Sequence, residues 1–519
     1  MTKSADRVRG GLAPARDARS IRAGERIHVV GAAGAGASAA ALIAHRAGAN
    51  VTACDVAGRS PYTVPLEAAG IVVATGHDPA HVTTPPAPDR LAVTRALSAV
   101  QPDHPELVAA RDLGIPLEAW QQVVADAAAG RTLVGVAGTH GKSTTAGWLV
   151  HVLAAAGADP SAFVGALLPS TVTDGPPATA RWGGGPAFVV EADEYAGNFD
   201  PYRPTVIVLT TAEWDHPDVF ADQAAVVDAF ERWIRRAPHG ATLIANVADE
   251  GVAAVVERLA DWPGDVTAYA LVDQAPQRLG GYGRGIAERF ATGAGPARAL
   301  LGRVTASDPI STSLEIHGLD PLTGLVPARL ASAGRHNAAN ALAVVGAAWV
   351  LGLEPSEITS GLVTFTGVGR RLERKGEAAG VLVFDDYGHH PTAIRETLAA
   401  VRQRAPGRRV WAAFEPLTFH RTAAMLGAFA EVLAEADGVA IADIWASRDP
   451  DTTITSPVVL ADAVAARRPG LPVFASGSVE ATAERLAREV QSGDVVLVMG
   501  GGRSYRIGEL LLERLEARR

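Results

Sequence analysis

The strongest chemical signal in this sequence is a glycine-rich turn between an apolar run and a helix-like stretch. Residues 138–144 read GTHGKST and directly follow the apolar residues 133–137. Such a turn points backbone N–H groups and a helix N-terminus at phosphate oxygens. Lys142 would reach the β- and γ-phosphates, and the Ser143 hydroxyl would ligate Mg²⁺. Val136 replaces the first glycine of the usual pattern, so we expect a shortened phosphate loop. Its expected members are Gly138, Thr139, His140, Gly141, Lys142, Ser143 and Thr144.

Acidic and imidazole side chains follow two further apolar runs. Residues 188–190 lead directly to Glu191, and residues 206–209 lead to Asp215 and His216. Ligands of open α/β sheets bind beyond the carboxyl ends of the strands, so we expect these groups to converge on the phosphate loop. Such a site would suit phosphoryl transfer. Because Mg²⁺ prefers oxygen ligands, His216 could instead donate a hydrogen bond to a phosphoryl oxygen. Each group taken alone could also be a solvated strand end.

Two other turns carry weaker signals. Residues 31–38 read GAAGAGAS between a strand-like and a helix-like segment, and Asp55 ends the next strand-like run. Ala33 replaces a glycine of the dinucleotide-binding fingerprint, which indicates a diphosphate-binding turn or merely tight packing of a helix on a strand. Residues 385–391 read DDYGHHP after another apolar run. The preceding Arg370-Arg371 pair suits phosphate binding or a solvated linker.

Composition restricts the class of protein. The chain has 519 residues, and Lys plus Arg (47) against Asp plus Glu (56) give a net charge of −9, unlike the basic footprint of nucleic-acid-binding proteins. The single cysteine, Cys54, suits a reducing compartment. The basic N-terminus lacks the apolar segment of a signal peptide, and no apolar run is long enough for a bilayer. We therefore expect a cytoplasmic monomer or homodimer whose partners are small molecules, with no nucleic acid and no membrane.

Short apolar runs alternate with helix-like stretches, which predicts an α/β protein with parallel sheets. The length suggests roughly three domains at about 150 residues each. We expect a flexible tail over residues 1–24 and domains over residues 25–127, 128–365 and 366–519.

Six motifs occur in an order that resembles the Mur ligases. They are GTHGKST (138–144), EADE (191–194), Asp215-His216, RHNAAN (335–340), GVGRR (367–371) and DDYGHHP (385–391). The resemblance spans the chain from about Ile27. It implies a Rossmann-like N-terminal domain that binds the UDP-sugar, a central P-loop ATPase domain, and a Rossmann-like C-terminal domain that closes on ATP and the amino acid.

The resemblance also implies the chemistry. An ADP-forming ligase of this type uses ATP and Mg²⁺ to phosphorylate a carboxylate, and an amine then displaces phosphate. The DDYGHHP run favours the members that join L-alanine to the lactoyl carboxylate of UDP-N-acetylmuramate in peptidoglycan precursor synthesis. The implied catalytic residues are Lys142, Glu191 and His216, the Mg²⁺ ligands are Ser143, Glu191 and His216, and the ATP contacts beyond the phosphate loop are Asn337, Arg371 and Asp386. The implied UDP-sugar contacts are Gly31, Gly34, Gly36, Ser38, Asp55, Ser60, Thr63 and His77, and the implied amino-acid pocket is Tyr387, His389 and Arg421.

The sequence departs from the family pattern at several positions. Leu417 and Thr418 replace two basic residues expected near the amino acid, whose carboxylate needs a cationic partner; His420 is a possible substitute. Thr211 replaces an asparagine, and Arg503 replaces an acid near the C-terminus. Three alternatives therefore stay open: a related ligase with another amino-acid or peptide acceptor, a dinucleotide-dependent oxidoreductase, and a nucleotide-binding protein without catalysis.

Overall fold

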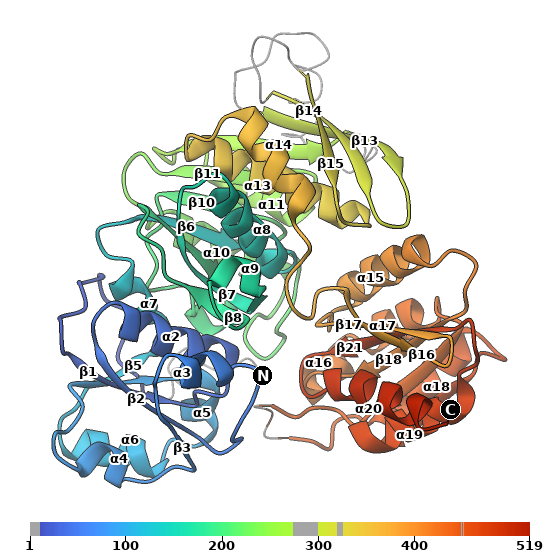
Figure 1. The fold of residues 1–519 in the computed structure, drawn as a ribbon, viewed down its shortest axis with the longest axis horizontal. Coiled ribbons are helices and arrows are strands. Elements are labelled where there is room, and N and C mark those ends of the chain that lie inside the picture. Colours follow the sequence, from blue (N-terminus) through green and yellow to red (C-terminus); the bar gives the residue numbers. More distant parts are fainter. Residues whose placement is uncertain (1–10, 273–298, 319–324, 448, 450, 519) are drawn as a thin grey trace.

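Three sheets follow one another along the chain in the computed structural model, which describes residues 11–272, 299–318, 325–447, 449 and 451–518. Figure 1 shows them as a blue, a green-to-yellow and an orange-to-red body. Most strands are parallel and alternate with helices, which confirms the predicted α/β class. The exact domain limits remain a prediction. Within the described residues, no helix combines the length and apolarity needed to cross a membrane.

The first sheet is parallel throughout, with the strand order β3-β2-β1-β4-β5. Helices connect its strands, as expected of a doubly wound sheet. The strands are β1 (Arg26–Val30), β2 (Asn50–Asp55), β3 (Val73–Thr75), β4 (Arg90–Val93) and β5 (Leu117–Ala119). The helices are α2 (Ala35–Arg46), α3 (Val64–Ala68), α4 (Ala80–Thr83), α5 (Arg95–Val100), α6 (Pro105–Asp112) and α7 (Trp120–Ala127).

The second sheet has ten strands in the order β15-β14-β13-β12-β11-β10-β6-β9-β7-β8, and its two edges are antiparallel. The strands are β6 (Thr132–Ala137), β7 (Ser161–Leu168), β8 (Ala178–Arg181), β9 (Ala187–Ala192), β10 (Val206–Leu209), β11 (Thr242–Asn246), β12 (Asp265–Leu271), β13 (Ala299–Ser307), β14 (Thr312–His317) and β15 (Leu325–Leu330). The helices are α8 (Lys142–Ala155), α9 (Ser170–Thr173), the 3₁₀ turn η1 (Tyr195–Gly197), α10 (Gln223–Ile234), α11 (Glu250–Arg258), α13 (Arg335–Val350) and α14 (Pro355–Thr364).

The third sheet has the order β16-β17-β21-β18-β19-β20, and only its edge strand β16 is antiparallel. The strands are β16 (Glu373–Ala378), β17 (Val381–Asp386), β18 (Val410–Glu415), β19 (Gly438–Ala442), β20 (Val473–Gly477) and β21 (Val495–Gly500). The helices are α15 (Pro391–Arg404), α16 (Phe419–Ala424), α17 (Leu426–Leu433), α18 (Pro457–Arg467), α19 (Val479–Glu489) and α20 (Tyr505–Glu516).

The central strands are apolar along their whole length because both faces are covered. In β18, Val410, Ala412 and Phe414 pack into the core cluster on one face of the sheet, whereas Trp411 and Ala413 pack into the cluster on the other. Side chains alternate between the two faces of a strand, so a strand covered on both faces needs an unbroken apolar run. This is the pattern from which these strands were predicted.

The register of the second sheet aligns three strand ends. Strand β6 lies between β9 and β10, and Ala137 is paired with Ala192 on one side and with Leu209 on the other. The segments that follow these three residues therefore leave the same edge of the sheet side by side. This edge carries the phosphate loop, the EADE run and the segment that contains His216.

A buried ion network stabilises the first domain. The Arg90 side chain is 2% exposed and contacts the carboxylates of Glu25, Glu118 and Asp126 at 3.1, 2.7 and 2.5 Å. Arg16, within the segment for which a tail was predicted, also pairs with Glu118 and Asp126. This part of the N-terminal segment is therefore held against the domain.

Replacing Arg90 with methionine should destabilise the protein strongly, because three carboxylates would lose their buried cation. Breaking such a buried network costs on the order of 3–5 kcal/mol. The matched control is Arg26→Ala, whose ion pair with Asp89 is partly exposed to solvent and should contribute little. Thermal and urea unfolding would measure both variants. Equal unfolding midpoints for the two variants would contradict the role given to Arg90.

Candidate active site

The phosphate loop joins the end of β6 to the N-terminus of α8, as the sequence predicts. Two of its glycines are required by close contacts. A Cβ on Gly138 would lie 2.2 Å from Thr210 Oγ1, and one on Gly141 would lie 2.6 Å from Asn340 Oδ1. Within the described part of the chain no side chain caps the N-terminus of α8, so its backbone N–H groups remain available for an anion. Thr211, which departs from the family pattern, accepts hydrogen bonds from the loop through its carbonyl and its hydroxyl oxygen.

Lys142 lies at the centre of the edge and pairs with Glu194, the last residue of the EADE run, for which the sequence predicted no role. Its Nζ donates to Glu194 Oε2 at 2.9 Å and to the carbonyl oxygen of Gly138. Burial raises the pKa of Glu194 to about 7, against the opposing charge of Lys142. Burial also disfavours the ammonium, yet Glu194 and Asp193 together raise the pKa of Lys142 above its ordinary value. The lysine therefore stays charged where phosphate oxygens are expected.

Ser143 and Glu191 present oxygen atoms beside Lys142. Ser143 Oγ donates to Glu191 Oε1 at 2.9 Å, and the other carboxylate oxygen accepts from the Gly165 N–H at 2.6 Å. The backbone bond fixes the orientation of the carboxylate. Arg371 of the third domain donates to Ser143 Oγ at 3.0 Å, so the predicted ATP contact reaches the phosphate loop. Mg²⁺ prefers oxygen ligands, and the Ser143 hydroxyl and the Glu191 carboxylate lie close enough together to bind one ion.

His216 is oriented by an arginine of the third domain. Arg421 donates to Asp215 Oδ1 at 2.7 Å and to His216 Nδ1 at 3.1 Å, and its side chain is 2% exposed. Burial would raise the pKa of Asp215, but Arg421 holds it well below its ordinary value. Because arginine only donates, His216 Nδ1 must accept, and the neutral ring then carries its proton on Nε2. The Nη1 atom of Arg421 is buried without a hydrogen-bond partner among the described residues.

The three predicted catalytic residues converge on this edge. Ligand atoms of Asp193, Glu194 and His216 lie within 4.8 Å of one another, and Lys142 contacts Glu194. Glu191 lies near the end of the neighbouring strand β9 and contacts Ser143, the residue next to Lys142. The side chains of the second and third domains therefore enclose one electrostatically coupled cluster.

The third domain supplies further contacts with the phosphate loop. The rings of His140 and His390 lie 4.6 Å apart, and Thr392 Oγ1 donates to Glu213 at 2.7 Å. Burial and the neighbouring His140 lower the pKa of His390 to about 4. His389 also lies in this region, and burial and Arg421 keep its pKa well below the ordinary value.

Two predicted ATP contacts also hold the local backbone. Both carboxylate oxygens of Asp386 accept backbone hydrogen bonds, from Leu372 and from Gly388. The amide of Asn337 donates to the carbonyl oxygen of Ala333, which precedes the N-terminus of α13. Contacts of these two residues with ATP remain a prediction. Tyr387 lies 5.5 Å below the guanidinium of Arg371, so this predicted pocket residue borders the same cluster.

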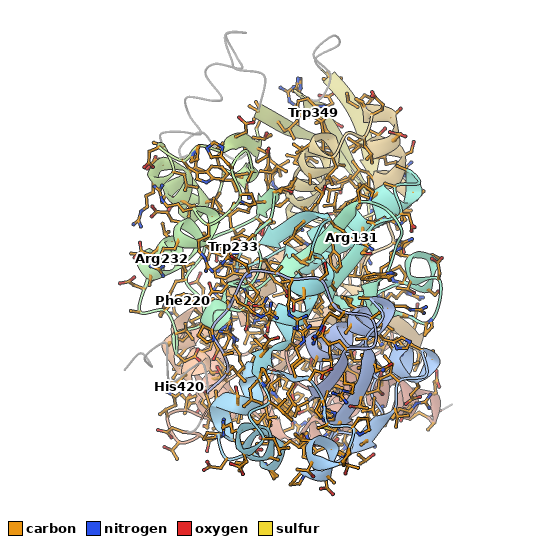
Figure 2. The ribbon with its side chains drawn as sticks, turned by 90° about the vertical axis from the view of Figure 1, so that its left-hand side faces the viewer. Arg131, Phe220, Arg232, Trp233, Trp349 and His420 are labelled. Carbon is orange, nitrogen blue, oxygen red and sulfur yellow. The ribbon has the colours of Figure 1, made fainter. Side chains whose placement is uncertain are left out.

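His420 lies away from this cluster. Its Nδ1 is 3.0 Å from Asp449, its side chain is 39% exposed, and Figure 2 shows it in the third domain near the surface. The partners of Asp215 and His216 come instead from Arg421. Of the two cationic candidates, only Arg421 therefore lies at the proposed reaction centre.

The predicted UDP-sugar residues gather in the first domain, around the turn after β1. The Asp55 carboxylate accepts from the Ala33 and Ala57 N–H groups at 2.9 and 2.7 Å. Ser60 Oγ donates to the Ala33 carbonyl oxygen. The Ser60 backbone N–H donates to Thr63 Oγ1, which donates in turn to the Ser60 carbonyl oxygen. These side chains therefore shape the turn. Gly31 has a positive φ, Gly34 precedes α2, and Gly36 lies inside α2 against Trp120. Ser38 contacts Thr179 of the second domain, and His77 contacts Cys54.

Comparisons with known proteins agree with the geometry. Three family models match successive parts of the chain: the Mur ligase family catalytic domain at residues 26–132, the Mur ligase middle domain at 136–348, and the glutamate ligase domain of Mur ligases at 370–502. Curated relatives include the UDP-N-acetylmuramate–L-alanine ligase of Frankia casuarinae, 36% identical over 95% of this chain and 98% of the relative. The ligase of the same name from Kineococcus radiotolerans is 38% identical over 95% and 97%.

Solved structures show the same fold. The UDP-N-acetylmuramate-alanine ligase of Thermotoga maritima matches with a TM-score of 0.73 and 22% identity, over 95% of this chain and 100% of that one. A murein peptide ligase of Psychrobacter arcticus matches with a TM-score of 0.70 and 23% identity, over 95% and 99%. Both likenesses extend across all three sheets.

The lowered pKa of His390 predicts an acid-sensitive fold. The folded state keeps this imidazole neutral, whereas the unfolded chain protonates it below about pH 6.5. The contribution of the neutral His390 imidazole to the free energy of unfolding is therefore complete above that pH. It falls by at most about 3 kcal/mol as the pH decreases toward about 4. His390→Asn retains a residue that can cap α15 and should lose less stability than the wild type between about pH 7 and about pH 4.5.

Urea unfolding at the two pH values would measure this difference. His239→Asn, at an exposed position, is the matched control and should behave as the wild type does. An equal acid-induced loss in the wild type and in His390→Asn would contradict the prediction.

Proposed function

The chain belongs to the Mur ligase family, and from this premise we propose that it joins L-alanine to the lactoyl carboxylate of UDP-N-acetylmuramate with conversion of ATP to ADP. The observation that carries the proposal is the meeting of Lys142, Glu191 and His216 with cations of the third domain. The curated relatives with this name cover nearly the whole chain. They give no support to the alternative of a dinucleotide-dependent oxidoreductase.

The residues present fit ATP and Mg²⁺. Uncapped N–H groups at α8 and the charged Lys142 suit phosphates, and Ser143 with Glu191 would hold Mg²⁺. When bound, Mg²⁺ neutralises phosphate charge. The sugar carboxylate attacks the γ-phosphorus of ATP, the bond to the β–γ bridging oxygen breaks, and ADP leaves. The amine of L-alanine then attacks the acyl phosphate, phosphate leaves, and the amine loses a proton to give the amide.

The chain's contribution to both steps is mainly electrostatic. A carboxylate must approach a triphosphate, and Lys142 and Arg371 reduce the repulsion between these two anions. The neutral Nε2–H of His216 would donate to a phosphoryl oxygen, because Arg421 occupies the other ring nitrogen. In this arrangement Nε2 has no lone pair for a metal ion. Of the two predicted roles of His216, this geometry supports hydrogen-bond donation.

Arg421 is also our candidate for recognition of the amino acid. Its buried Nη1 lacks a hydrogen-bond partner among the described residues. A buried N–H group normally has an acceptor, so a bound ligand would supply one here. The carboxylate of L-alanine would satisfy it with a charge-assisted hydrogen bond. Leu417 and Thr418 do not supply the cations of the family pattern, so a peptide or another amino acid remains the alternative acceptor.

We further propose that the protein acts in the cytoplasm, where ATP and nucleotide sugars are available. Its single cysteine suits that reducing compartment. Both a monomer and a homodimer agree with this assignment.

ADP release by the purified protein tests the function. Continued release over many turnovers should require ATP, Mg²⁺, UDP-N-acetylmuramate and L-alanine together, since the amine must consume the acyl phosphate before the next turnover. Lys142→Ala should lower the rate by roughly a hundredfold or more, because it removes charge stabilisation at the phosphates. Lys375→Ala is the matched control, since Lys375 pairs with Glu373 and Glu509 outside the site. ADP release that is independent of the sugar nucleotide would refute the proposal.

A panel of acceptors in the same assay tests the amino acid. We expect the largest kcat/KM for L-alanine, compared with glycine, L-serine and short peptides that begin with L-alanine. A larger value for a peptide would establish the alternative acceptor and leave the ligase chemistry intact.

The role of His216 has its own measurement. His216→Ala should lower kcat and leave the Mg²⁺ concentration for half-maximal activity unchanged, because the imidazole donates to phosphate and does not ligate the ion. Glu191→Gln is the positive control and should raise that concentration, since it removes a charged Mg²⁺ ligand. A raised Mg²⁺ requirement in His216→Ala would show that this imidazole is a ligand.

A further inference from the structure

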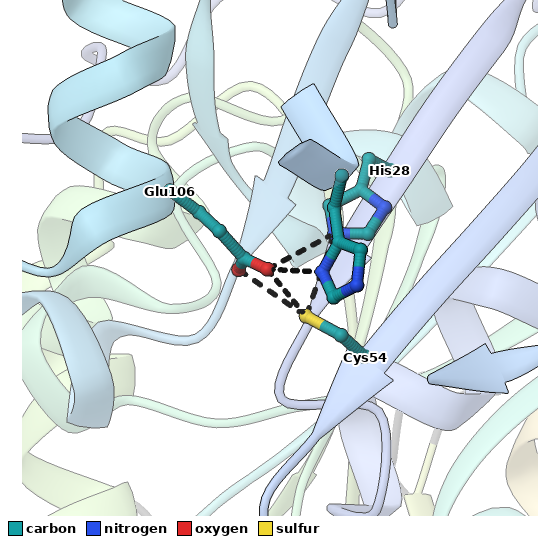
Figure 3. Close-up of side chains that lie close together, drawn as sticks. His28, Cys54 and Glu106 are labelled. Atoms are coloured by element: carbon teal, nitrogen blue, oxygen red, sulfur yellow. Dashed lines mark hydrogen bonds and ion pairs between the residues drawn. The ribbon is translucent and has the colours of Figure 1, made fainter. Parts of the chain in front are cut away.

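A second cluster of metal-ligating side chains lies in the first domain, apart from the proposed reaction centre. His28 comes from β1, Cys54 from β2, His81 from α4 and Glu106 from α6. One ligand atom of each lies within 4.8 Å of all the others. His28 and Cys54 are 1% and 0% exposed, and Glu106 is 0% exposed. Figure 3 shows His28, Cys54 and Glu106 directed at a common point.

The distances among three of the four ligands are close to the edges of a small tetrahedron. Cys54 Sγ lies 3.4 Å from His28 Nε2 and 3.2 Å from either oxygen of Glu106, and His28 Nε2 lies 3.8 Å from Glu106 Oε1. Zinc bonds of about 2.0–2.3 Å in tetrahedral geometry separate ligand atoms by about 3.3–3.6 Å. The His81–Glu106 contact of 2.6 Å is a hydrogen bond and would open by less than about 1 Å on metal binding.

The surroundings of His28 also fit a ligand. Its Nδ1 lies 2.8 Å from Thr52 Oγ1, so an N–H···O bond there leaves the Nε2 lone pair directed at the cluster. Metal-bound imidazoles usually have such a partner on the other nitrogen. His77 Nδ1, 3.3 Å from Cys54 Sγ, offers a further donor beside the cluster.

Charge balance points in the same direction. Glu106 is completely buried, and its ion pairs within the described part of the chain are with imidazoles and with no lysine or arginine. His104, also buried, has no hydrogen-bond partner on either ring nitrogen among the residues that the structure describes, and it packs edge-on against His77 at 4.3 Å. A buried carboxylate needs a paired cation, and a divalent ion would supply one.

We propose that His28, Cys54, His81 and Glu106 form a structural Zn²⁺ site. Thiolate and imidazole ligands select zinc over Mg²⁺, which keeps this site chemically distinct from Ser143 and Glu191. The ion would join two strands and two helices below the nucleotide turn, since the Cys54 carbonyl oxygen accepts from the Gly31 and Ala32 N–H groups. The inference does not depend on the acceptor of the ligase.

Cobalt substitution tests the site without an activity assay. Co²⁺ bound to a thiolate gives a charge-transfer absorption band, and Cys54 is the only cysteine of the chain. The full-length protein, stripped with chelator and titrated with Co²⁺, should develop this band, and stoichiometric Zn²⁺ should abolish it. Absence of the band, or its persistence in Cys54→Ser, would overturn the proposal.

Metal content and unfolding provide a second test in a variant expected to fold. After dialysis the wild type should retain about one zinc per chain. His81→Ala alters a partly exposed ligand and should lower zinc affinity at least about tenfold, in line with loss of one ligand interaction. Chelator should lower the wild-type melting temperature but not that of His81→Ala. His239→Ala is the exposed control and should match the wild type; equal zinc retention in all three proteins would contradict the assignment.

Discussion

The concentration of negative charge where β6, β9 and β10 end is the constraint on which the site depends. Glu191 lies near the end of β9, Asp193 and Glu194 follow this strand, and Asp215 lies beyond β10. A buried carboxylate without a cation costs several kcal/mol, and the raised pKa of Glu194 reflects this cost even beside Lys142. The single positive charge of Lys142 cannot balance the negative charge of these carboxylates and of a bound triphosphate. The site therefore needs cations from elsewhere in the chain, in addition to Mg²⁺.

The third domain meets this need through two arginines. Arg371 reaches the phosphate-loop serine, and Arg421 pairs with Asp215. Arg421 also contacts His216. Its Nη1 atom has no hydrogen-bond partner among the described residues, so it could donate to a ligand carboxylate. One rigid guanidinium would thus connect amino-acid binding with the orientation of the group that faces the phosphoryl oxygens. Juxtaposition of the second and third domains is consequently part of the chemistry.

The sequence was informative where local pattern determines structure. Residues 206–209 were predicted as a strand and form β10, and convergence of Lys142, Glu191 and His216 followed from the rule for strand ends. The partners of these side chains were not predictable in the same way. Arg421 lies 206 residues from Asp215, and Cys54 contacts His28 and Glu106 from other elements. Such pairs depend on how the domains and helices pack, which local periodicity does not encode.

The two proposed ion sites differ in the chemistry of their ligand atoms. The reaction centre offers the hydroxyl of Ser143 and the carboxylate of Glu191, which suit a hard, exchangeable ion that arrives with ATP. The first domain offers a thiol and imidazoles, which suit a softer ion held without exchange. Because the Cys54 carbonyl oxygen also accepts from the start of the nucleotide turn, rigidity at this residue would pass directly to the loop that faces the diphosphate. A buried metal below a binding loop fixes the loop's backbone while leaving its upper surface for the ligand.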